Sequence, residues 1–301
     1  MAIALILQFF EDFWRKFELD CHFSILPDRR LNAQFVPVLS IVDTNVVSEV
    51  LKNRNEEARN FLDLIFLQGY IPCFSIFTIL ELRKKPDVYS EFLRLFSVFP
   101  CFILKSIDQL FADELQSYPD PSTITPILIA SPGVAAAPDS SLKQILDLTF
   151  ASSENTKNET LWNEGKESVI EGITELVKNF PSGSGKYTSK EIRIFIEMAG
   201  FQQIAMRAPK FARDIVSEGN AVAIDAFPSV KMTLLMVFFK FYVDQRKPLT
   251  SDTFDLLISA PTPYMDAIFT EKHLVEIIRK VKKVDPFLNK VTAMTISDIR
   301  K

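Results

Sequence analysis

The chain has few of the residues that support disulfide or zinc chemistry. Its 301 residues include only three cysteines and two histidines. Cys21, Cys73 and Cys101 form no CxxC pair, and an odd number of cysteines argues against a disulfide framework. His22 and His273 are too few for a ribonuclease that uses a histidine pair, and they argue against a zinc site. We therefore expect a reducing compartment and a cytoplasmic protein.

The sequence also lacks a hydrophobic run that could cross a membrane. The apolar start, 2–10, has no basic segment and leads directly into acidic residues, so it resembles an amphipathic helix more than a signal peptide. The other apolar run, 233–243, is interrupted by Lys240 and is too short to span a bilayer. We expect a soluble protein with no membrane partner.

The composition favours a folded chain with a large core. Apolar residues make up 48% of the sequence, and 27 phenylalanines supply much of this content. The net charge of −4 does not suggest strong nonspecific attraction to nucleic acid, although it allows local basic patches. The length has room for one large domain or two small ones.

Short apolar segments alternate with helical patterns in two parts of the chain. The expected strands are 36–43, 70–74, 98–104, 265–270 and 291–296. Alternating strands and helices are typical of a parallel sheet with helices packed on it. We therefore predict an α/β domain formed by 36–104 and 248–301 together.

The remaining parts of the chain follow a different pattern. Phenylalanines at helical spacing predict a helical extension over 1–35. The segment 105–247 shows no convincing strand and is predicted to be a helical insertion or subdomain. Within it, 117–140 is rich in proline, serine and alanine and predicts an irregular loop. The helices expected after this loop are 141–150, 160–179, 188–200, 206–219 and 230–246.

Acidic residues stand where the predicted strands and helices meet. Asp43 ends the first strand, and ligands of open α/β sheets bind outside the carboxyl ends of strands. The alternative is structural, because Thr44 or Asn45 could simply cap the next helix. Asp252 and Asp255 are one helical turn apart behind Ser251, which we expect to cap their helix. Asp252 could itself be explained by a capping role.

An α/β sheet can gather the acidic residues along one edge, together with Glu81 and Glu271. Clustered carboxylates repel each other and are costly to bury unless a cation compensates them. Carboxylate oxygens suit Mg²⁺ or Mn²⁺, which also bind phosphate oxygens. Such ions lower the pKa of an attacking water and neutralise charge on a phosphate, so the pattern predicts phosphodiester hydrolysis.

Three motifs resemble those of the PIN-domain nuclease family. They are Asp43-Thr44-Asn45, Thr78-x-x-Glu81 and Ser251-Asp252-x-x-Asp255. The run 263–272, Pro-Tyr-Met-Asp-Ala-Ile-Phe-Thr-Glu-Lys, looks like that of larger bacterial PIN-like proteins. The resemblance covers 38–104 and 248–297. It implies a three-layer α/β sandwich with a central parallel sheet of about five strands, and metal-dependent cleavage, usually of RNA.

Carried onto this chain, the resemblance implies that Asp43, Glu81, Asp252 and Asp255 are catalytic and bind the metal, with Asp266 as a further ligand. Which of Asp252, Asp255 and Asp266 is the main third ligand stays open. Auxiliary roles are implied for Asn45, Thr78, Thr270 and Glu271. The family usually has aspartate or asparagine after the threonine, so the glutamate at 271 departs from its pattern.

Two basic groups are candidates for holding a nucleic-acid backbone. They are Arg83-Lys84-Lys85, which follows Glu81, and Arg279-Lys280-Lys282-Lys283. Lys272, which follows Glu271, is a further candidate. The alternative is that such cations are solvated helix ends. The function expected is a divalent-metal-dependent endoribonuclease that acts as a toxin or as a defence or stress effector. The alternative is a catalytically degenerate module that binds RNA or protein. An antitoxin or inhibitor protein, and a homodimer, are the further partners considered.

Overall fold

The computed structural model describes residues 37–53, 55–131, 133, 138–151, 167, 169–178 and 186–299. The chain divides into two compact units, 1–36 and 37–301, and the fold described here belongs to the second. The predicted helical extension over 1–35 lies outside the described residues, as does most of 160–168. The predicted boundaries of the insertion, 105–247, stay a prediction.

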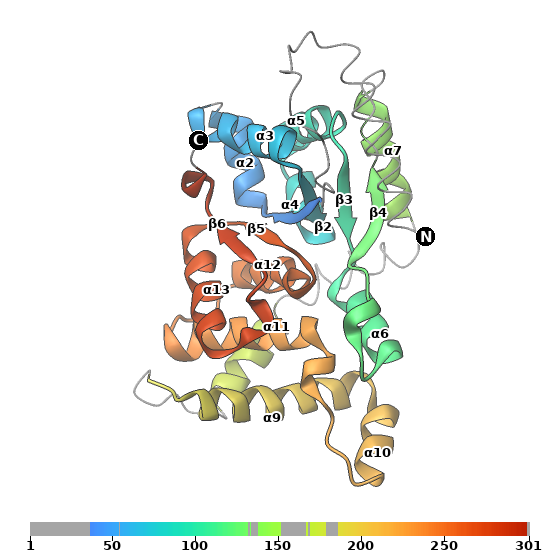
Figure 1. Cartoon of the computed structure of the whole chain (residues 1–301), viewed down its shortest axis with the longest axis vertical. Coiled ribbons are helices and arrows are strands. Elements are labelled where there is room, and N and C mark those ends of the chain that lie inside the picture. Colours follow the sequence, from blue (N-terminus) through green and yellow to red (C-terminus); the bar gives the residue numbers. More distant parts are fainter. Residues whose placement is uncertain are drawn as a thin grey trace, which may run out of the picture. The chain divides into compact units, whose positions relative to one another are not determined.

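A six-stranded, mostly parallel sheet forms the centre of this unit (Figure 1). The strand order is β4-β3-β2-β1-β5-β6, with β4 antiparallel to β3 and all other neighbours parallel. The strands are β1 Val38–Val42, β2 Tyr70–Ser75, β3 Cys101–Leu104, β4 Ile127–Ser131, β5 Ala267–Phe269 and β6 Thr292–Met294. The five parallel strands lie within or beside the segments expected from the sequence, so the α/β class is confirmed.

Strand β4 corrects the prediction that 117–140 is an irregular loop. It pairs with the outer side of β3, with Cys101 opposite Ser131. The strand lies between Pro126 and Pro132, and prolines are tolerated at the ends of an edge strand. The proline-rich and serine-rich surroundings therefore concealed a short apolar run that completes the sheet edge.

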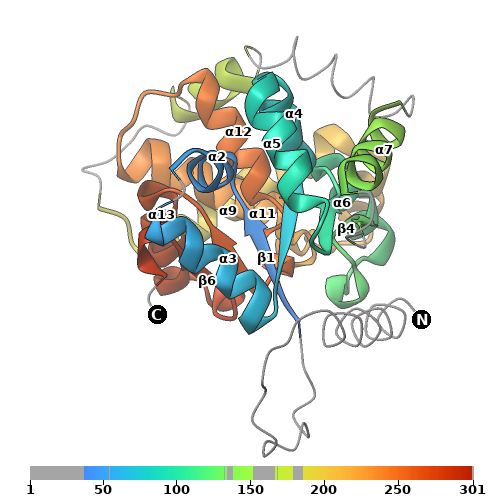
Figure 2. The same cartoon turned by 90° about the horizontal axis from the view of Figure 1, so that it is seen from above.

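Helices connect the strands and pack on the sheet. Helices α3 and α4 contact β2, α13 contacts β6 and α7 contacts β4. Figure 2 shows α2, α4, α5 and α12 grouped together, in agreement with the contacts among them. The helices around the sheet are α2 Thr44–Asn53, α3 Glu56–Gln68, α4 Ile76–Arg83, α5 Pro86–Phe96, α7 Pro138–Ala151, α12 Thr250–Ser259 and α13 Lys272–Val284.

A second group of helices stacks below the sheet in the view of Figure 1. Helix α11 packs against α6, α9 and α12, and α9 packs against α10. A π-helix, Phe238–Val243, continues α11 directly. The helices of this group are α6 Ile107–Ser117, α9 Ser189–Arg207, α10 Pro209–Ser217 and α11 Pro228–Val237. Among the described residues, no helix is long and apolar enough to cross a membrane.

Phenylalanines from β2, β5 and the helices beside them fill part of the core. The ring of Phe74 meets those of Phe92 and Phe96 edge-on, at centroid distances of 5.0 and 4.9 Å. Phe269 of β5 contacts Phe61 of α3 in the same way at 5.2 Å. Edge-to-face ring contacts add to the hydrophobic gain of burial. These side chains therefore have a structural role, as the apolar pattern predicts.

Local signals fix the ends of the first helices. Gly69 ends α3 with a φ of 75°, in the left-handed region that glycine adopts without strain. The Ser75 hydroxyl accepts a hydrogen bond from the Phe77 amide at 3.2 Å and caps α4. The two caps place the start of α4, and hence Glu81, relative to the end of β2.

Gly133 offers a test of the close packing beside β3 and β4. Its φ is +69°, and a Cβ there would lie 2.6 Å from the backbone carbon of Phe99. We expect Gly133→Ala to lower the free energy of unfolding by about 2–4 kcal/mol, measured by urea denaturation, because it adds a clash to the left-handed strain.

Gly219→Ala is the matched control. Gly219 has a φ of +76° but nothing within 4 Å of an added Cβ. Gly219→Ala should therefore lower the free energy of unfolding only by the cost of the left-handed backbone, about 1–2 kcal/mol. Equal losses in the two variants would contradict the close approach at Gly133.

Candidate active site

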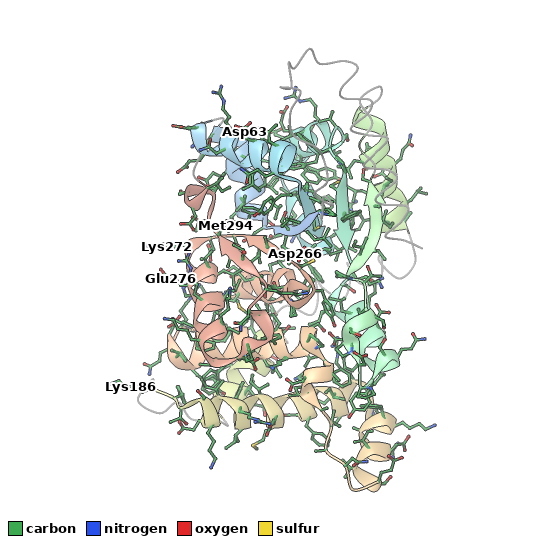
Figure 3. The ribbon with its side chains drawn as sticks, viewed as in Figure 1. Asp63, Lys186, Asp266, Lys272, Glu276 and Met294 are labelled. Atoms are coloured by element: carbon green, nitrogen blue, oxygen red, sulfur yellow. The ribbon has the colours of Figure 1, made fainter. Side chains whose placement is uncertain are left out.

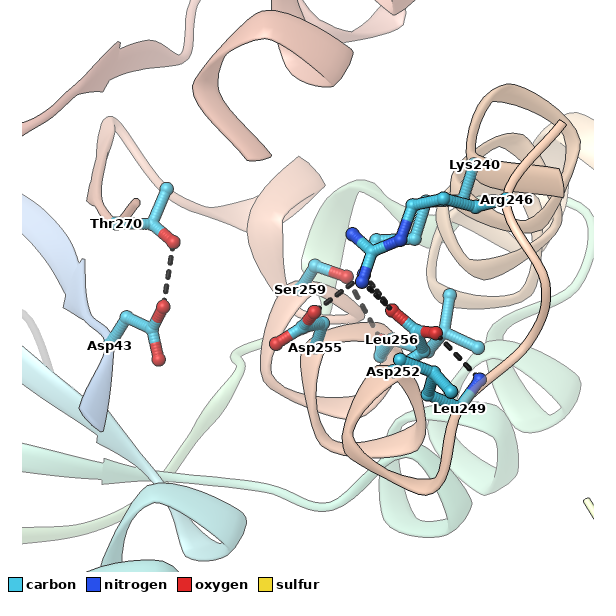
Figure 4. A network of polar contacts seen from close by, with 9 residues as sticks. All are labelled: Asp43, Lys240, Arg246, Leu249, Asp252, Asp255, Leu256, Ser259 and Thr270. Carbon is cyan, nitrogen blue, oxygen red and sulfur yellow. Dashed lines mark hydrogen bonds and ion pairs between the residues drawn. The ribbon is translucent and has the colours of Figure 1, made fainter. Parts of the chain in front are cut away.

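Asp43 lies at the point where β1 ends and α2 begins. Its amide donates to the carbonyl of Phe269 at 3.0 Å, and its carbonyl accepts from Val47 in the first turn of α2. Its side chain is 3% exposed. The Thr270 hydroxyl donates to the carboxylate Oδ2 at 2.7 Å (Figure 4). Because β1 and β5 are parallel neighbours, the residues that follow them meet at one edge of the sheet.

Glu81 reaches the same edge from α4. The Thr44 hydroxyl, at the first residue of α2, donates to Glu81 Oε2 at 2.5 Å. Thr44 therefore links the two acidic positions. Thr78 lies one turn before Glu81, is fully buried, and its hydroxyl has no hydrogen-bond partner among the described residues.

Asp255 is the third carboxylate of this group. Its charge raises the pKa of both Asp43 and Glu81. Figure 4 shows its carboxylate on the side of α12 turned toward Asp43, with Asp252 and Lys240 behind it. We refer to Asp43, Glu81 and Asp255 as the acidic triad.

Burial and mutual repulsion make the acidic triad costly to ionise fully. Burial raises the pKa of Asp43 to about 7, and the charges of Asp255 and Glu81 add to this. Hydrogen bonds from Thr270 and the Thr44 backbone oppose the shift. Burial also raises the pKa of Glu81, with a smaller contribution from Asp255. A cation at this edge of the sheet would offset both the cost of burying the charged carboxylates and their mutual repulsion.

Asp252 has a different environment from Asp255, although they are one turn apart. It is 0% exposed, and its Oδ2 accepts from the Leu249 amide at 2.8 Å. Its Oδ1 is 3.0 Å from Lys240 Nζ and 3.3 Å from Arg246. Helix α12 begins at Thr250, so Ser251 is not its cap, contrary to the prediction. The Asp252 carboxylate thus closes the helix start and pairs with two cations.

Asp266 lies at the other end of β5 from Thr270. Its Oδ2 accepts from the Leu39 amide at 2.9 Å, near the start of β1. Figure 3 shows Asp266 and Lys272, which flank β5, well apart. The structure therefore does not bring Asp266 to the acidic triad. A carboxylate at the amino end of a strand cannot share an ion with one beyond the carboxyl end.

The structure does bring four other predicted residues together beside Asp43. They line one cavity of about 470 Å³ at the carboxyl ends of β1, β5 and β6, which also includes Arg279. Glu271 is the residue just before α13, without a side-chain cap contact of its own. The four residues are Asn45, Thr270, Glu271 and Lys272.

The other predicted basic group follows Glu81 at the end of α4. Arg83, Lys84 and Lys85 are exposed. The charges of Lys84 and Lys85 lower the pKa of Glu81, which places them close to the acidic triad. Arg83 lies over the Phe150 ring at 4.5 Å and Lys84 over Phe254 at 5.0 Å. The aromatic contacts anchor this basic edge.

A second buried carboxylate lies away from the triad. Glu114 of α6 accepts from the amide and hydroxyl of Ser229, at 2.7 and 2.8 Å, and from the Tyr264 hydroxyl at 2.7 Å. Burial raises its pKa to about 7. Three donors from α11 and the 263–272 run satisfy it, so we assign it a structural role.

The triad fits a hard divalent ion in kind and in charge, since it offers carboxylate oxygens whose repulsion a cation would relieve. It is not a closed coordination shell. In the part of the chain that the structure describes, no three or more His, Cys, Asp or Glu side chains converge closely enough to hold an ion.

Comparisons of the chain with family models, curated proteins and solved structures find no match. The arrangement of the site's own residues therefore carries the functional argument.

The raised pKa of Asp43 predicts a pH dependence of stability. The Asp43 carboxyl has a pKa near 7 in the folded chain and an ordinary pKa of 3.8. Its protonation therefore favours the folded state, and this contribution to stability is fully present below about pH 4. This contribution is lost as the pH rises from about 4 to 7. In chelator, the stability of Asp43→Asn relative to the wild type should therefore rise by up to about 4 kcal/mol over this range.

Urea denaturation at several pH values measures the effect. A stability difference between Asp43→Asn and the wild type that stays constant from pH 4 to 7 would show that Asp43 ionises normally.

Proposed function

We propose that this protein is a divalent-metal-dependent endoribonuclease with a PIN-like three-layer fold. The observation that carries the proposal is the acidic triad at the carboxyl edge of a parallel sheet. Its members come from the end of β1, from α4 and from α12, and the charge of Asp255 raises the pKa of both Asp43 and Glu81. Perturbed carboxylates gathered at such an edge are typical of a functional site.

The acidic triad would hold Mg²⁺ or Mn²⁺. A bound ion supplies a water of lowered pKa and neutralises charge on the phosphate. Thr270 and Thr44 each donate to one carboxylate oxygen and thereby fix the orientation of Asp43 and Glu81.

Basic side chains on two sides of the acidic triad support a polyanionic substrate. Lys84 and Lys85 lie beside Glu81, and Lys272 and Arg279 line the cavity beside Thr270. Cations placed next to a carboxylate site can hold the phosphates that flank a cleaved bond. RNA as the substrate follows from the resemblance alone. A toxin, defence or stress role, an antitoxin or inhibitor partner, a homodimer and a cytoplasmic location stay predictions.

The first test measures cleavage of labelled single-stranded RNA by the full chain with Mg²⁺ or Mn²⁺. Asp43→Asn, Glu81→Gln and Asp255→Asn should each reduce the rate by at least about 100-fold, because each removes a ligand of the ion. Asp266→Asn should keep the rate within about threefold, because its carboxylate lies at the other end of β5. Full activity of Asp43→Asn would refute the proposal.

The second test concerns the basic edge, with RNA binding measured in the Asp43→Asn background. Lys85→Ala should weaken binding and lower the slope of log affinity against log salt by about 0.7, as expected for one lost phosphate contact on a single strand. Lys210→Ala, an exposed lysine on α10, should change neither quantity. If Lys85→Ala leaves the slope of log affinity against log salt unchanged, Lys85 does not contact the RNA backbone.

The alternative function is a degenerate PIN-like module that binds RNA or protein without cleavage. The wide spacing of the acidic triad favours this alternative, since no three His, Cys, Asp or Glu side chains of the described residues lie close enough together to hold an ion. Calorimetric titration with Mn²⁺ separates the two functions. A degenerate module would bind RNA yet show no saturable Mn²⁺ binding.

A further inference from the structure

Lys240 is a fully buried lysine directly behind the acidic triad. It is 0% exposed and lies on the π-helix between aromatic residues that are themselves buried. Its ammonium is 2.5 Å from Asp255 Oδ2 and 3.0 Å from Asp252 Oδ1. A buried ammonium is costly unless close anions compensate it, so this position requires both carboxylates.

The backbone after α11 brings the side chains of Lys240 and Arg246 to Asp252. The π-helix shifts the hydrogen bonds by one residue, as in the contact from the Asp244 amide to the Phe239 carbonyl at 3.0 Å. Gln245 then adopts a φ of 49°, which is uncommon for a residue other than glycine. The turn directs Arg246 back to Asp252 at 3.3 Å. Such π-helical turns are frequent at functional sites.

Charge counting limits the number of ions that the site can take. The acidic triad and Asp252 together carry four negative charges when ionised, and Lys240 and Arg246 contribute two positive charges. The remainder of −2 matches one divalent ion. A second ion would give the site a net charge of +2 before substrate arrives, and Lys84 and Lys85 would add to the repulsion.

The contacts of Asp255 point to the same limit. One of its oxygens is bound to Lys240 Nζ, so an ion at that oxygen would lie beside the ammonium and be repelled by it. In two-ion sites, carboxylates neutralise and clamp both ions. Asp252 is no better placed, because Lys240 and Arg246 already neutralise its Oδ1 and the Leu249 amide binds its Oδ2.

We propose that Lys240 takes the place of a second metal ion: the site binds one divalent ion, and the Lys240 ammonium supplies the other positive charge and positions Asp255. This inference rests on the proposed metal-dependent function. Lys240 is a positioning residue, since it is buried and acts on the reaction through Asp255.

Calorimetric titration of the full chain with Mn²⁺, without RNA, tests the number of ions. The wild type should bind one ion per chain. Two ions would overturn this inference but leave the metal-dependent function intact. The absence of saturable binding would contradict the proposed function, and with it this inference.

Lys240→Met supplies the second measurement. It removes the ammonium from Asp255 and Asp252, so Mn²⁺ binding should rise from one ion to two per chain. Mn²⁺ should also stabilise this variant against heat more than the wild type. A folded Lys240→Met that still binds one ion with unchanged affinity would overturn the inference. If this variant does not fold, Lys240→Arg, which keeps the charge, must bind one ion as the wild type does, and two ions would overturn the inference.

Lys231→Met is the matched control. Lys231 is also buried and pairs with two carboxylates, Asp225 at 2.6 Å and Asp285 at 2.5 Å, away from the acidic triad. Lys231→Met also releases two acids from a buried lysine, although Asp225 is exposed, and it should leave the number of bound Mn²⁺ ions at one. A second ion in Lys231→Met would show that any released acid pair binds Mn²⁺, and would overturn the special role of Lys240.

Discussion

The hydrogen bond from Thr270 to Asp43 is the contact on which the site depends. It joins the ends of β1 and β5, which pair as parallel neighbours although Asp43 and Thr270 are 227 residues apart in sequence. The bond favours the ionised form of a carboxylate that burial would otherwise keep protonated. The pairing of β1 with β5 therefore sets both the position and the charge of Asp43.

Around this contact, each acidic side chain has its own donor. Thr44 holds Glu81, Lys240 holds Asp255, and Lys240 and Arg246 share Asp252. Hydroxyls orient the carboxylates without cancelling their charge, whereas ammonium and guanidinium groups neutralise them. Asp43 has no cationic partner among the described residues, whereas Asp252 has two. A cation at this edge of the sheet would therefore meet less repulsion on the side of Asp43 than beside Asp252.

The sheet could be predicted from the sequence because each parallel strand is an apolar run followed by a helix signal. Strand β4 was missed since prolines surround it, and α6 was missed although Ser106 and Gln109 form a capping box at its start. Lys240 was visible only as an interruption of an apolar run. Its partners, Asp252 and Asp255, follow the turn at Gln245. No spacing rule in a sequence predicts a contact between an ammonium and a carboxylate across such a turn.

The acidic motif shows why spacing alone could not choose between Asp252 and Asp255. Both lie on one face of α12, but Asp252 is at the third helical position, where a carboxylate can reach back to the free amide of Leu249. That bond occupies Asp252 and leaves the next turn, with Asp255, to face Asp43. In the same way, Tyr264 and Asp266 of the 263–272 run bind Glu114 and Leu39, so only its last three residues, Thr270, Glu271 and Lys272, reach the site. The helix start and the strand start each use an acid for structure. Asp255, one turn later in the helix, and Thr270, beyond the strand, are therefore the residues of these two segments that lie close to Asp43.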